Sequence, residues 1–331
     1  MATHLTPLHI RVQTAIRQHR LLQKGQRLLL GVSGGQDSLC LLQILRDLAP
    51  RWDWQIFVLH CDHRWTPDET RCAQFLQSWF QAQDIPYAIE TADPITLDEN
   101  RARQWRYQCL GTWALAWQCS TVLTAHTGSD QVETFLFNLM RGSGPQGLTS
   151  LGWSRPLHQE RPNSPQLVRP MLQVWRHETA SFCQDRQLPV WPDLTNQDLS
   201  HPRNRIRQEL IPYLQKHFNP QVEAALNRTA TLIAAEHAWI EEQTQQLWPQ
   251  VYREDPEGLS RPLLQKSPLA LQRQILFTFL CHHLCGAPSF DQVEVLLHLV
   301  SAPRRSQTPP FPGGGWARVE DDWIRWHVEA E

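Results

Sequence analysis

The chain has 331 residues, of which 41% are hydrophobic, and a formal net charge of −2. This length suits about two domains with a sizeable core, and no run of about 18 uncharged apolar residues is present to span a membrane. The near-neutral charge does not indicate a nucleic-acid partner by itself. The basic N-terminus lacks a secretory apolar segment, and the eight cysteines contain no C-x-x-C pair. We therefore expect a cytoplasmic protein with reduced thiols and no membrane partner.

Charges are distributed unevenly along the chain. Residues 1–36 carry Arg11, Arg17, Arg20, Lys24 and Arg27 without an acid, and residues 201–208 carry three arginines without an acid. Such segregation fits an anionic macromolecule that docks on one side of the protein. Ordinary solvated faces explain the same pattern equally well, so charge alone leaves both interpretations open.

Strands and helices are predicted to alternate along the first two thirds of the chain. Apolar runs predict strands at 28–32, 54–60, 87–91, 121–125 and 167–172. Helical periodicity and start signals predict helices at 9–22, 39–48, 68–83, 97–118, 128–140, 174–186 and 201–218. Pro212 is expected to kink or break the last helix. The alternation predicts an α/β fold with a parallel, doubly wound sheet, in which ligands bind beyond the carboxyl ends of the strands.

The remainder of the chain is predicted to be mainly helical. Helices are expected at 221–248, 269–284 and 290–300, and residues 316–319 and 323–326 are expected to pair as a short β hairpin. We therefore predict an α/β domain over residues 1–217. A smaller, mainly helical domain with a C-terminal hairpin is predicted over 218–331.

The hexapeptide Ser33–Ser38 lies between the first strand and the helix that follows it. Its two glycines allow a sharp turn and a close approach of the backbone to a ligand. Amide groups at the start of the helix, with the helix dipole, favour an anion at this position. Glycine, aspartate and serine are also common in ordinary turns. Because strand, turn and helix follow in the right order, we favour a phosphate site.

Two further strand ends carry candidate side chains. His60 and His63 lie at the end of the second strand, where a ligand or a purely structural role is open. Asp130 and Glu133 follow the fourth strand and share a helix face. Opposite a triphosphate, the two acids suit a Mg²⁺ site, or an ammonium group and a base for its proton. As acids at a helix start, they also suit simple capping.

The hexapeptide resembles the signature of the PP-loop ATP pyrophosphatases, and further segments narrow the resemblance. They are His60–His63, Glu99–Tyr107, Asp130–Thr134, Arg141–Gly144 with Gly147–Leu148, and Arg203–Arg207 with Leu210–Leu214. In this order they are similar to the tRNA(Ile)-lysidine synthetase family. Members of that family often carry two adjacent acids before the glutamine of the fourth strand's motif. This chain has Ser129 before Asp130.

The resemblance implies an ATP-dependent ligase of tRNA. Its substrates would be ATP, free L-lysine and the isoleucine tRNA with a CAU anticodon. The wobble cytidine would be adenylated with release of pyrophosphate, and lysine would then displace AMP at C2 to give lysidine. Reading of the codon would thereby change from AUG to AUA. Residues 1–217 would form the catalytic domain, and residues 218–331 would bind tRNA or substrate.

The resemblance also implies roles for individual residues. The catalytic residues would be Asp37, Asp130 and Glu133. The ATP-binding residues would be Ser33, Gly34, Gly35, Gln36, Asp37, Ser38, His60 and His63. Asp37 and Asp130 would hold Mg²⁺. The residues that contact tRNA would be Arg103, Arg106, Arg141, Arg203, Arg205 and Arg207.

Two other functions compete with this interpretation. A PP-loop tRNA thiolation enzyme would share the loop, but it generally needs an iron–sulfur cluster or paired cysteines, and the chain has no C-x-x-C pair. A non-catalytic tRNA-binding protein with a degenerate loop is the second alternative. The complete hexapeptide and the retained Asp130 and Glu133 argue against it. The oligomeric state is left open, and a homodimer is compatible with the sequence.

Overall fold

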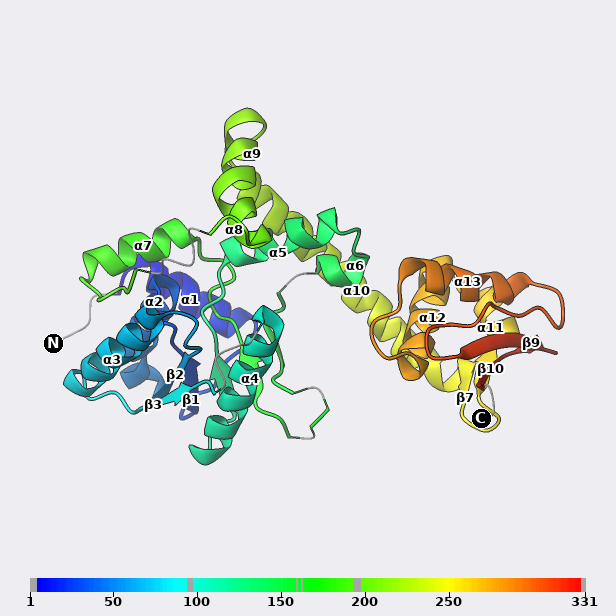
Figure 1. The fold of residues 1–331 in the computed structure, drawn as a ribbon, viewed down its shortest axis with the longest axis horizontal. Coiled ribbons are helices and arrows are strands. Elements are labelled where there is room, and N and C mark those ends of the chain that lie inside the picture. Colours follow the sequence, from blue (N-terminus) through cyan, green and yellow to red (C-terminus); the bar gives the residue numbers. More distant parts are fainter. Residues whose placement is uncertain are drawn as a thin grey trace. The chain divides into compact units, whose positions relative to one another are not determined.

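The computed structural model describes residues 5–93, 98–149, 151–158, 160–161, 163–192 and 198–328. The chain forms two compact units (Figure 1). The first comprises Met1–Arg141 and Ser150–Ala230, and the second comprises Gly142–Thr149 and Thr231–Glu331. The observed division therefore falls inside a long helix, α10 (Val222–Val251), whereas the sequence placed a domain boundary just before that helix.

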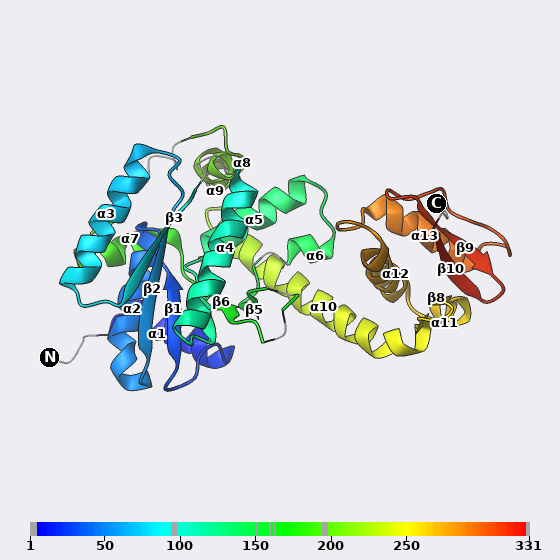
Figure 2. The same cartoon turned by 60° about the horizontal axis from the view of Figure 1, so that its bottom comes forward.

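The first unit is built on a six-stranded sheet with the order β3-β2-β1-β4-β6-β5 (Figure 2). Its strands are β1 (Arg27–Gly31), β2 (Gln55–Asp62), β3 (Tyr87–Thr91), β4 (Thr121–Leu123), β5 (Ser154–Pro156) and β6 (Gln166–Val168). Five strands run parallel, and only β5 pairs antiparallel, with β6. The chain leaves β1 toward β2 on one side and returns to β4 on the other. This topological switch confirms the predicted doubly wound sheet, and ligands bind at such a switch point.

Helices cover both faces of this sheet. Leu28 and Leu30 of β1 belong to a core shared with α1 (Pro7–Gln18), α2 (Gln36–Trp52), α3 (Pro67–Ala82) and α7 (Arg176–Asp185). Leu29 faces the opposite side, in a core with α4 (Glu99–Ala116). A strand that is buried on both faces has apolar residues on both, which explains the unbroken run that predicted β1.

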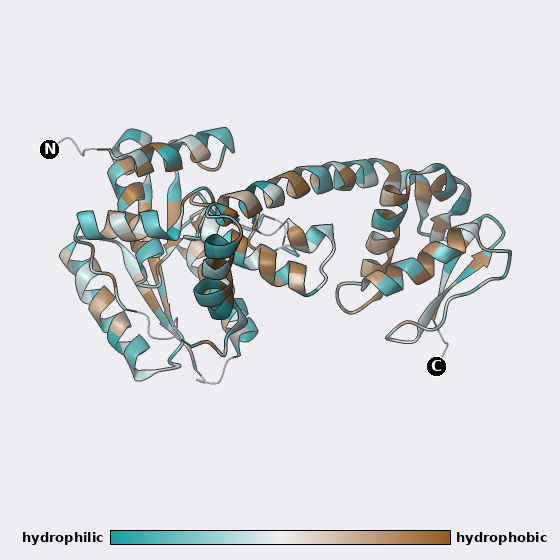
Figure 3. Cartoon of the chain, turned by 90° about the horizontal axis from the view of Figure 1, so that it is seen from above, coloured by the Kyte–Doolittle hydropathy of each residue, from teal (hydrophilic) through white to brown (hydrophobic). Residues whose placement is uncertain are grey.

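The predicted helices of the first unit are present, and their observed ends differ by a few residues. The segment α5 (Gly128–Met140) begins and ends as predicted. Apolar and polar residues are interspersed along the helices (Figure 3), as amphipathic helices require. The strand β5 was not predicted, because its three residues are too few for a periodic signal.

The predicted helix at 201–218 is interrupted before its proline. It consists of α8 (Pro202–Arg205), a π-helical turn over Ile206–Leu210 and α9 (Ile211–His217). Pro212 lies in the first turn of α9, where its missing amide hydrogen costs little. The π-helical turn comes just before Pro212, whose nitrogen has no hydrogen to donate to a carbonyl of the preceding turn. The interruption therefore agrees with the predicted break.

The second unit combines helices with a small antiparallel sheet of order β7-β8-β10-β9. Its strands are β7 (Tyr252–Arg253), β8 (Gly258–Ser260), β9 (Gly315–Glu320) and β10 (Trp323–Val328). Its helices, besides the end of α10, are α6 (Pro145–Leu148), α11 (Arg261–Lys266), α12 (Leu269–His283) and α13 (Phe290–Ser301). The predicted hairpin is confirmed as β9–β10, but β8 and β7 extend it, and they are too short to predict. Within the described ranges, no helix has the length and apolar character needed to cross a bilayer.

Candidate active site at the carboxyl edge of the sheet

The loop after β1 is tied together by its own serines. The Ser33 amide donates to Ser38 Oγ at 3.2 Å, the Gly35 amide donates to Ser33 Oγ at 3.3 Å, and Ser38 Oγ donates to the Gly35 carbonyl at 2.8 Å. Gly34 has a φ of +89°, and a Cβ there would lie 2.8 Å from Cys72 Sγ. Glycine is therefore required at this position, and the loop delivers two amides to the start of α2.

Asp37 and Gln36, at the start of α2, are held by the start of α7. Thr179 Oγ1 donates a very short hydrogen bond to Asp37. Gln36 Nε2 donates to the Arg176 carbonyl at 2.8 Å and to Thr179 Oγ1 at 3.0 Å. Burial raises the pKa of the Asp37 carboxyl, against the opposing effects of Thr179 and Arg176. The contacts of Gln36 fix α7 against the loop, so its side chain has a positioning role in this structure.

Asp130 caps the N-terminus of its own helix, α5. It accepts from the Thr127 amide at 2.7 Å and from Thr127 Oγ1 at 2.8 Å. Burial opposes ionisation of Asp130, but Arg176, His126 and Thr127 outweigh burial, so its pKa lies below the usual value. Asp130 therefore caps its helix and also belongs to the candidate site, because one carboxylate oxygen bonds to Thr127 and the other contacts Arg176.

Arg176 joins the three acids that the sequence singled out. Its Nη2 lies 2.6 Å from Asp130 Oδ1, its Nη1 lies 2.7 Å from Glu133 Oε1, and its Nε lies 3.5 Å from Asp37 Oδ2. Burial alone would lower its pKa, but the three carboxylates raise it above the ordinary arginine value. Sequence reasoning missed Arg176. Its position at a helix start shortly after β6 was the available signal.

Glu133 is shared by two arginines. Its side chain is only 3% exposed, and besides Arg176 it accepts from Arg207 Nε at 2.7 Å and from Nη2 at 3.0 Å. Three carboxylates thus face two guanidinium groups. When all three are ionised, the cluster carries one uncompensated negative charge, which favours a further cation at this edge.

Ser129, at the position where the resemblance leads one to expect a second acid, is buried and has two partners. Its Oγ donates to Glu223 Oε1 at 3.1 Å and accepts from the Arg176 amide at 3.3 Å. The residue therefore links the start of α7 to the start of α10, at a place where an additional carboxylate would meet Glu223.

The two predicted histidines lie at the end of β2, which pairs with β1. His60 Nδ1 lies 2.8 Å from the Val32 carbonyl, so that nitrogen carries the proton, and Nε2 has no partner among the described residues. The His63 ring stacks on the Trp65 ring with 5.1 Å between ring centroids, and it meets the Trp105 ring edge-on with 5.0 Å between ring centroids. Burial lowers the pKa of His63 to about 4, with a contribution from Arg106. Both imidazoles are therefore neutral at physiological pH.

The remaining predicted arginines do not join the acid cluster. Arg203 and Arg205 are exposed on α8, and Arg205 makes only a loose contact of 4.0 Å with Glu209. Arg141 ends α5 and lies over the Phe137 ring at 5.2 Å. Arg103 and Arg106 lie on α4. These side chains remain available to a polyanion, whereas Arg207 is engaged with Glu133.

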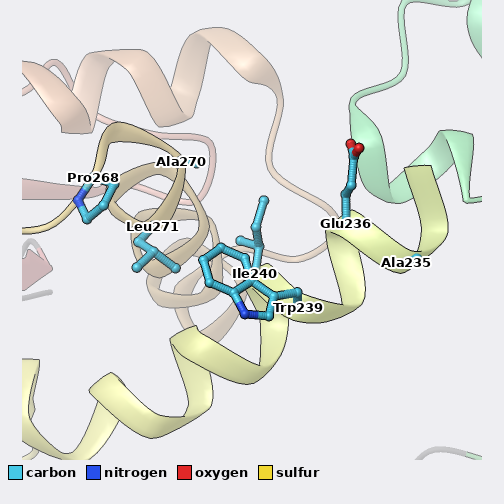
Figure 4. Close-up of a pocket in the computed structure, with 7 residues that line it drawn as sticks. All are labelled: Ala235, Glu236, Trp239, Ile240, Pro268, Ala270 and Leu271. Atoms are coloured by element: carbon cyan, nitrogen blue, oxygen red, sulfur yellow. The ribbon is translucent and has the colours of Figure 1, made fainter. Parts of the chain in front are cut away.

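The second unit offers a different kind of surface. A hollow between α10 and the start of α12 is lined by Trp239, Ile240, Pro268 and Leu271, with Ala235, Glu236 and Ala270 (Figure 4). Glu236 is the one ionisable residue of the seven drawn, so this hollow lacks the groups that acid–base chemistry needs. The clustered titratable side chains described above all belong to the first unit.

Comparison with known proteins agrees with this geometry. A family model described as a PP-loop domain matches residues 6–214. A tRNA(Ile)-lysidine synthase from a Synechococcus species is 60% identical over 97% of this chain and 98% of its own length. Its counterpart from a Nostoc species is 45% identical over 96% of both chains. The chain belongs to the tRNA(Ile)-lysidine synthase family. The family predicted from the sequence is thus confirmed, and with it an ATP-using ligase.

A solved structure shows how widely the family's fold is shared. The U34-tRNA thiolase NcsA from Methanococcus maripaludis aligns with a TM-score of 0.57, over 69% of this chain and 78% of its own, at 15% sequence identity. At this identity the likeness shows a common fold only. Membership of the lysidine synthase family therefore rests on the sequence relatives and not on this structure.

Proposed function

We propose that this chain ligates free lysine to C2 of the wobble cytidine in the CAU-anticodon isoleucine tRNA, at the expense of ATP. The observation that carries the proposal is the meeting of an anion-binding loop and three acids through Arg176 at one edge of the sheet. The family relationship supplies the reaction, and this edge supplies groups for both of its halves. We further propose that residues 1–217 catalyse and that residues 218–331 help to bind the tRNA.

The reaction has two steps, adenylation of the cytidine and transfer of lysine. In the first, the C2 oxygen of cytidine attacks the α-phosphorus of ATP, and the bond to the β-phosphate breaks to release pyrophosphate. In the second, the ε-amine of lysine attacks C2 and the C2–oxygen bond breaks to release AMP. The amine must lose its protons along the way, so a base is needed near the attacking nitrogen. Adenylation converts a poor leaving oxygen into a good one.

ATP is assigned to the loop and its neighbours. The amides of Ser33 and Gly35 now bond to the loop's own hydroxyls, and phosphate oxygens would replace those acceptors. His60 and His63 lie at the end of the adjacent strand β2, and as neutral rings they can bond to a nucleotide without adding charge. Fixed donors aimed at the phosphates stabilise charge that develops during pyrophosphate release.

Lysine is assigned to the acids at the start of α5. Asp130 and Glu133 share a helix face, and the three-carboxylate, two-arginine cluster leaves a negative charge for an ammonium group. The same carboxylates can accept the proton that the amine loses. Arg176 then acts as a positioning residue, because it contacts both acids and holds them in place.

Mg²⁺ is assigned to Asp37 and Asp130, and the donor set fits that ion. In the described part of the chain no three His, Cys, Asp or Glu side chains form a metal cage. Mg²⁺ commonly uses only one or two carboxylates and takes its other ligands from substrate phosphates and water. When bound, the ion would neutralise charge on the phosphates. The chain's own residues provide the two carboxylates, both held near Arg176.

The exposed arginines are assigned to the tRNA. Arg203 and Arg205 on α8, with Arg103, Arg106 and Arg141, lack strong carboxylate partners among the described residues. Such groups bind phosphates through planar, bidentate contacts. Arg207 was predicted with them, and its two bonds to Glu133 favour a supporting role at the lysine subsite.

Transfer of labelled lysine to tRNA tests the proposal. The full-length protein is incubated with ATP, Mg²⁺, labelled lysine and the CAU-anticodon isoleucine tRNA, and the tRNA is digested to nucleosides. We expect labelled lysidine, with AMP and pyrophosphate formed in equal amounts. Asp37→Ala and Asp130→Ala should abolish labelling. A tRNA that stays unlabelled, or one that is labelled without ATP, contradicts the proposal.

A further inference from the structure

A group of arginines surrounds one tyrosine on the α4 side of the sheet. The guanidinium of Arg155 lies 5.3 Å from the centre of the Tyr107 ring, and that of Arg103 lies 5.6 Å from it. Arg169 and Arg106 are close enough to act electrostatically on the same phenol. Four positive charges thus converge on one aromatic side chain. Such a gathering is unfavourable unless something negative joins it.

The fold brings these residues together from separate elements. Arg103, Arg106 and Tyr107 lie on α4, which follows β3. Arg155 lies on β5, and Arg169 directly follows β6. Because β6 is parallel to the central strands, Arg169 lies at the same carboxyl edge as the loop after β1. The group is therefore at the ligand edge of the sheet, beyond β4 from the proposed ATP loop.

These charges have no carboxylate to balance them. Among the described residues, none of the four arginines forms an ion pair, whereas Arg101 on the same helix faces Asp98 at 3.6 Å. Arg169 is only 2% exposed. One of its nitrogens donates to the Gly152 carbonyl at 2.7 Å, and its Nε has no partner within the described ranges. Burial lowers the pKa of Arg169, the Tyr107 phenol opposes this effect, and Arg155 and Arg103 add to it.

A buried guanidinium whose Nε is unsatisfied and which no carboxylate of the described residues balances is costly, so this arrangement points to a bound anion. Arginine suits phosphate better than any other side chain, because its planar fork makes two parallel bonds. The loop assigned to ATP follows β1, two strands away from β6, and neighbouring strands lie about 5 Å apart. RNA carries a phosphate on each side of the nucleotide that reacts at this edge, so RNA reaches both places at once.

We propose that Arg155 and Arg169, with Arg103 and Tyr107, form a binding site for a backbone phosphate of the substrate RNA. This inference rests on the proposed function, since it places the phosphate of an RNA that the enzyme modifies. It adds Arg155, on the short strand β5 that the sequence did not predict, and Arg169, which directly follows β6. Lysine also carries a carboxylate, and the test below separates that anion from RNA.

The test uses Arg155→Gln in the full-length protein, because Arg155 is partly exposed and its removal leaves Arg169 to hold Gly152. Equilibrium binding of the tRNA is measured without ATP or lysine, at several salt concentrations. We expect binding about 10-fold weaker at 0.15 M salt, and a slope of log affinity against log salt that is smaller by about 0.7 to 1. The KM for lysine should stay unchanged.

Matched variants distinguish a phosphate site from a structural role. Arg101→Gln removes an exposed arginine of α4 that pairs with Asp98, and it should leave affinity and salt slope at the wild-type values. Arg169→Lys keeps the positive charge but loses the planar guanidinium that can make two parallel bonds. It should therefore weaken tRNA binding with little change in the slope of log affinity against log salt. Unchanged tRNA affinity in Arg155→Gln overturns the inference, as does a rise in the KM for lysine alone. If wild-type protein itself fails to transfer lysine, the proposed function fails instead.

Discussion

Arg176 donates a 2.6 Å hydrogen bond from Nη2 to Oδ1 of Asp130. The arginine begins α7 and the aspartate caps α5, so this pair locks two helix starts together at the ligand edge. The same guanidinium also reaches Glu133 and Asp37.

Replacing Arg176 by alanine should destabilise the first unit and disable lysine transfer. Three carboxylates would lose their shared partner, and breaking a buried pair costs about 3–5 kcal/mol. Because the Arg176 side chain is 25% exposed, we expect roughly 2 to 3 kcal/mol. Hydrogen exchange of α5 and α7 amides measures this loss.

Two variants serve as controls for Arg176→Ala. Arg176→Lys should rescue stability only in part, because an ammonium group cannot bridge three carboxylates. Arg71→Ala removes an exposed arginine that pairs with Asp68 at 3.2 Å, and it should change stability by less than about 0.5 kcal/mol. If Arg176→Ala is as harmless as Arg71→Ala, the bridging role is wrong.

Replacing Gly34 by alanine should weaken ATP binding strongly. The new methyl would meet Cys72 Sγ at 2.8 Å and Leu76 at 3.2 Å, at a φ of +89°. Gly142→Ala is the control, since its φ is +73° but nothing lies within 4 Å of the added Cβ. Both variants bear backbone strain of about 1–2 kcal/mol, and only Gly34→Ala distorts the loop. Calorimetric titration with ATP should show a loss for Gly34→Ala alone, and equal affinities would refute the argument.

Replacing Ser129 by aspartate creates two adjacent acids, as the resemblance leads one to expect, but should destabilise this chain. The new carboxylate would lie beside Glu223, to which Ser129 now donates at 3.1 Å. Repulsion between two partly buried carboxylates should cost roughly 1 to 3 kcal/mol. Glu223→Gln should relieve most of that cost in the double variant. A double-mutant cycle measures the coupling, and additive effects of the two substitutions would show that they do not interact.

His126 should stay neutral well below the pH at which histidine usually titrates. Burial lowers the pKa of His126 to about 4, with contributions from Arg169 and Arg106. The unfolded chain would bind a proton near pH 6.5 that the folded chain does not bind, so stability falls as the pH drops from about 6.5 toward 4. The Cε1 proton signal that disappears in His126→Gln should keep its neutral position at pH 5.5. A midpoint between 6 and 7 would contradict this environment.

The sheet and its functional edge were predictable because both follow from local patterns. Buried strands give unbroken apolar runs such as Leu28–Leu30, and the carboxyl ends of parallel strands gather at one edge. This rule places Ser33–Ser38, Asp130 and Glu133 together from the sequence alone. The hairpin of the second unit was predictable for the same reason, because its two apolar runs flank Asp321-Asp322.

The partners of the site residues were not predictable in the same way. Arg176 looked like any arginine at a helix start, and only the packing of α7 on α2 brings it to three acids. Arg207 was expected to face RNA with Arg203 and Arg205, but it lies within the π-helical turn and its side chain contacts Glu133. The short strands β5, β7 and β8 have too few residues for a periodic signal.

The assignment of ATP to the loop and of lysine to the acids is tested most directly by Glu133→Gln in a rapid-quench experiment. Pyrophosphate release is followed first with ATP and the tRNA but without lysine, and labelled lysine is then added. We predict that adenylation, seen as one pyrophosphate per active site, remains within about threefold of wild type, while lysine transfer falls at least about 100-fold. Lysine transfer that persists at the wild-type rate, or adenylation lost to the same extent as transfer, would contradict the assignment of Glu133 to lysine.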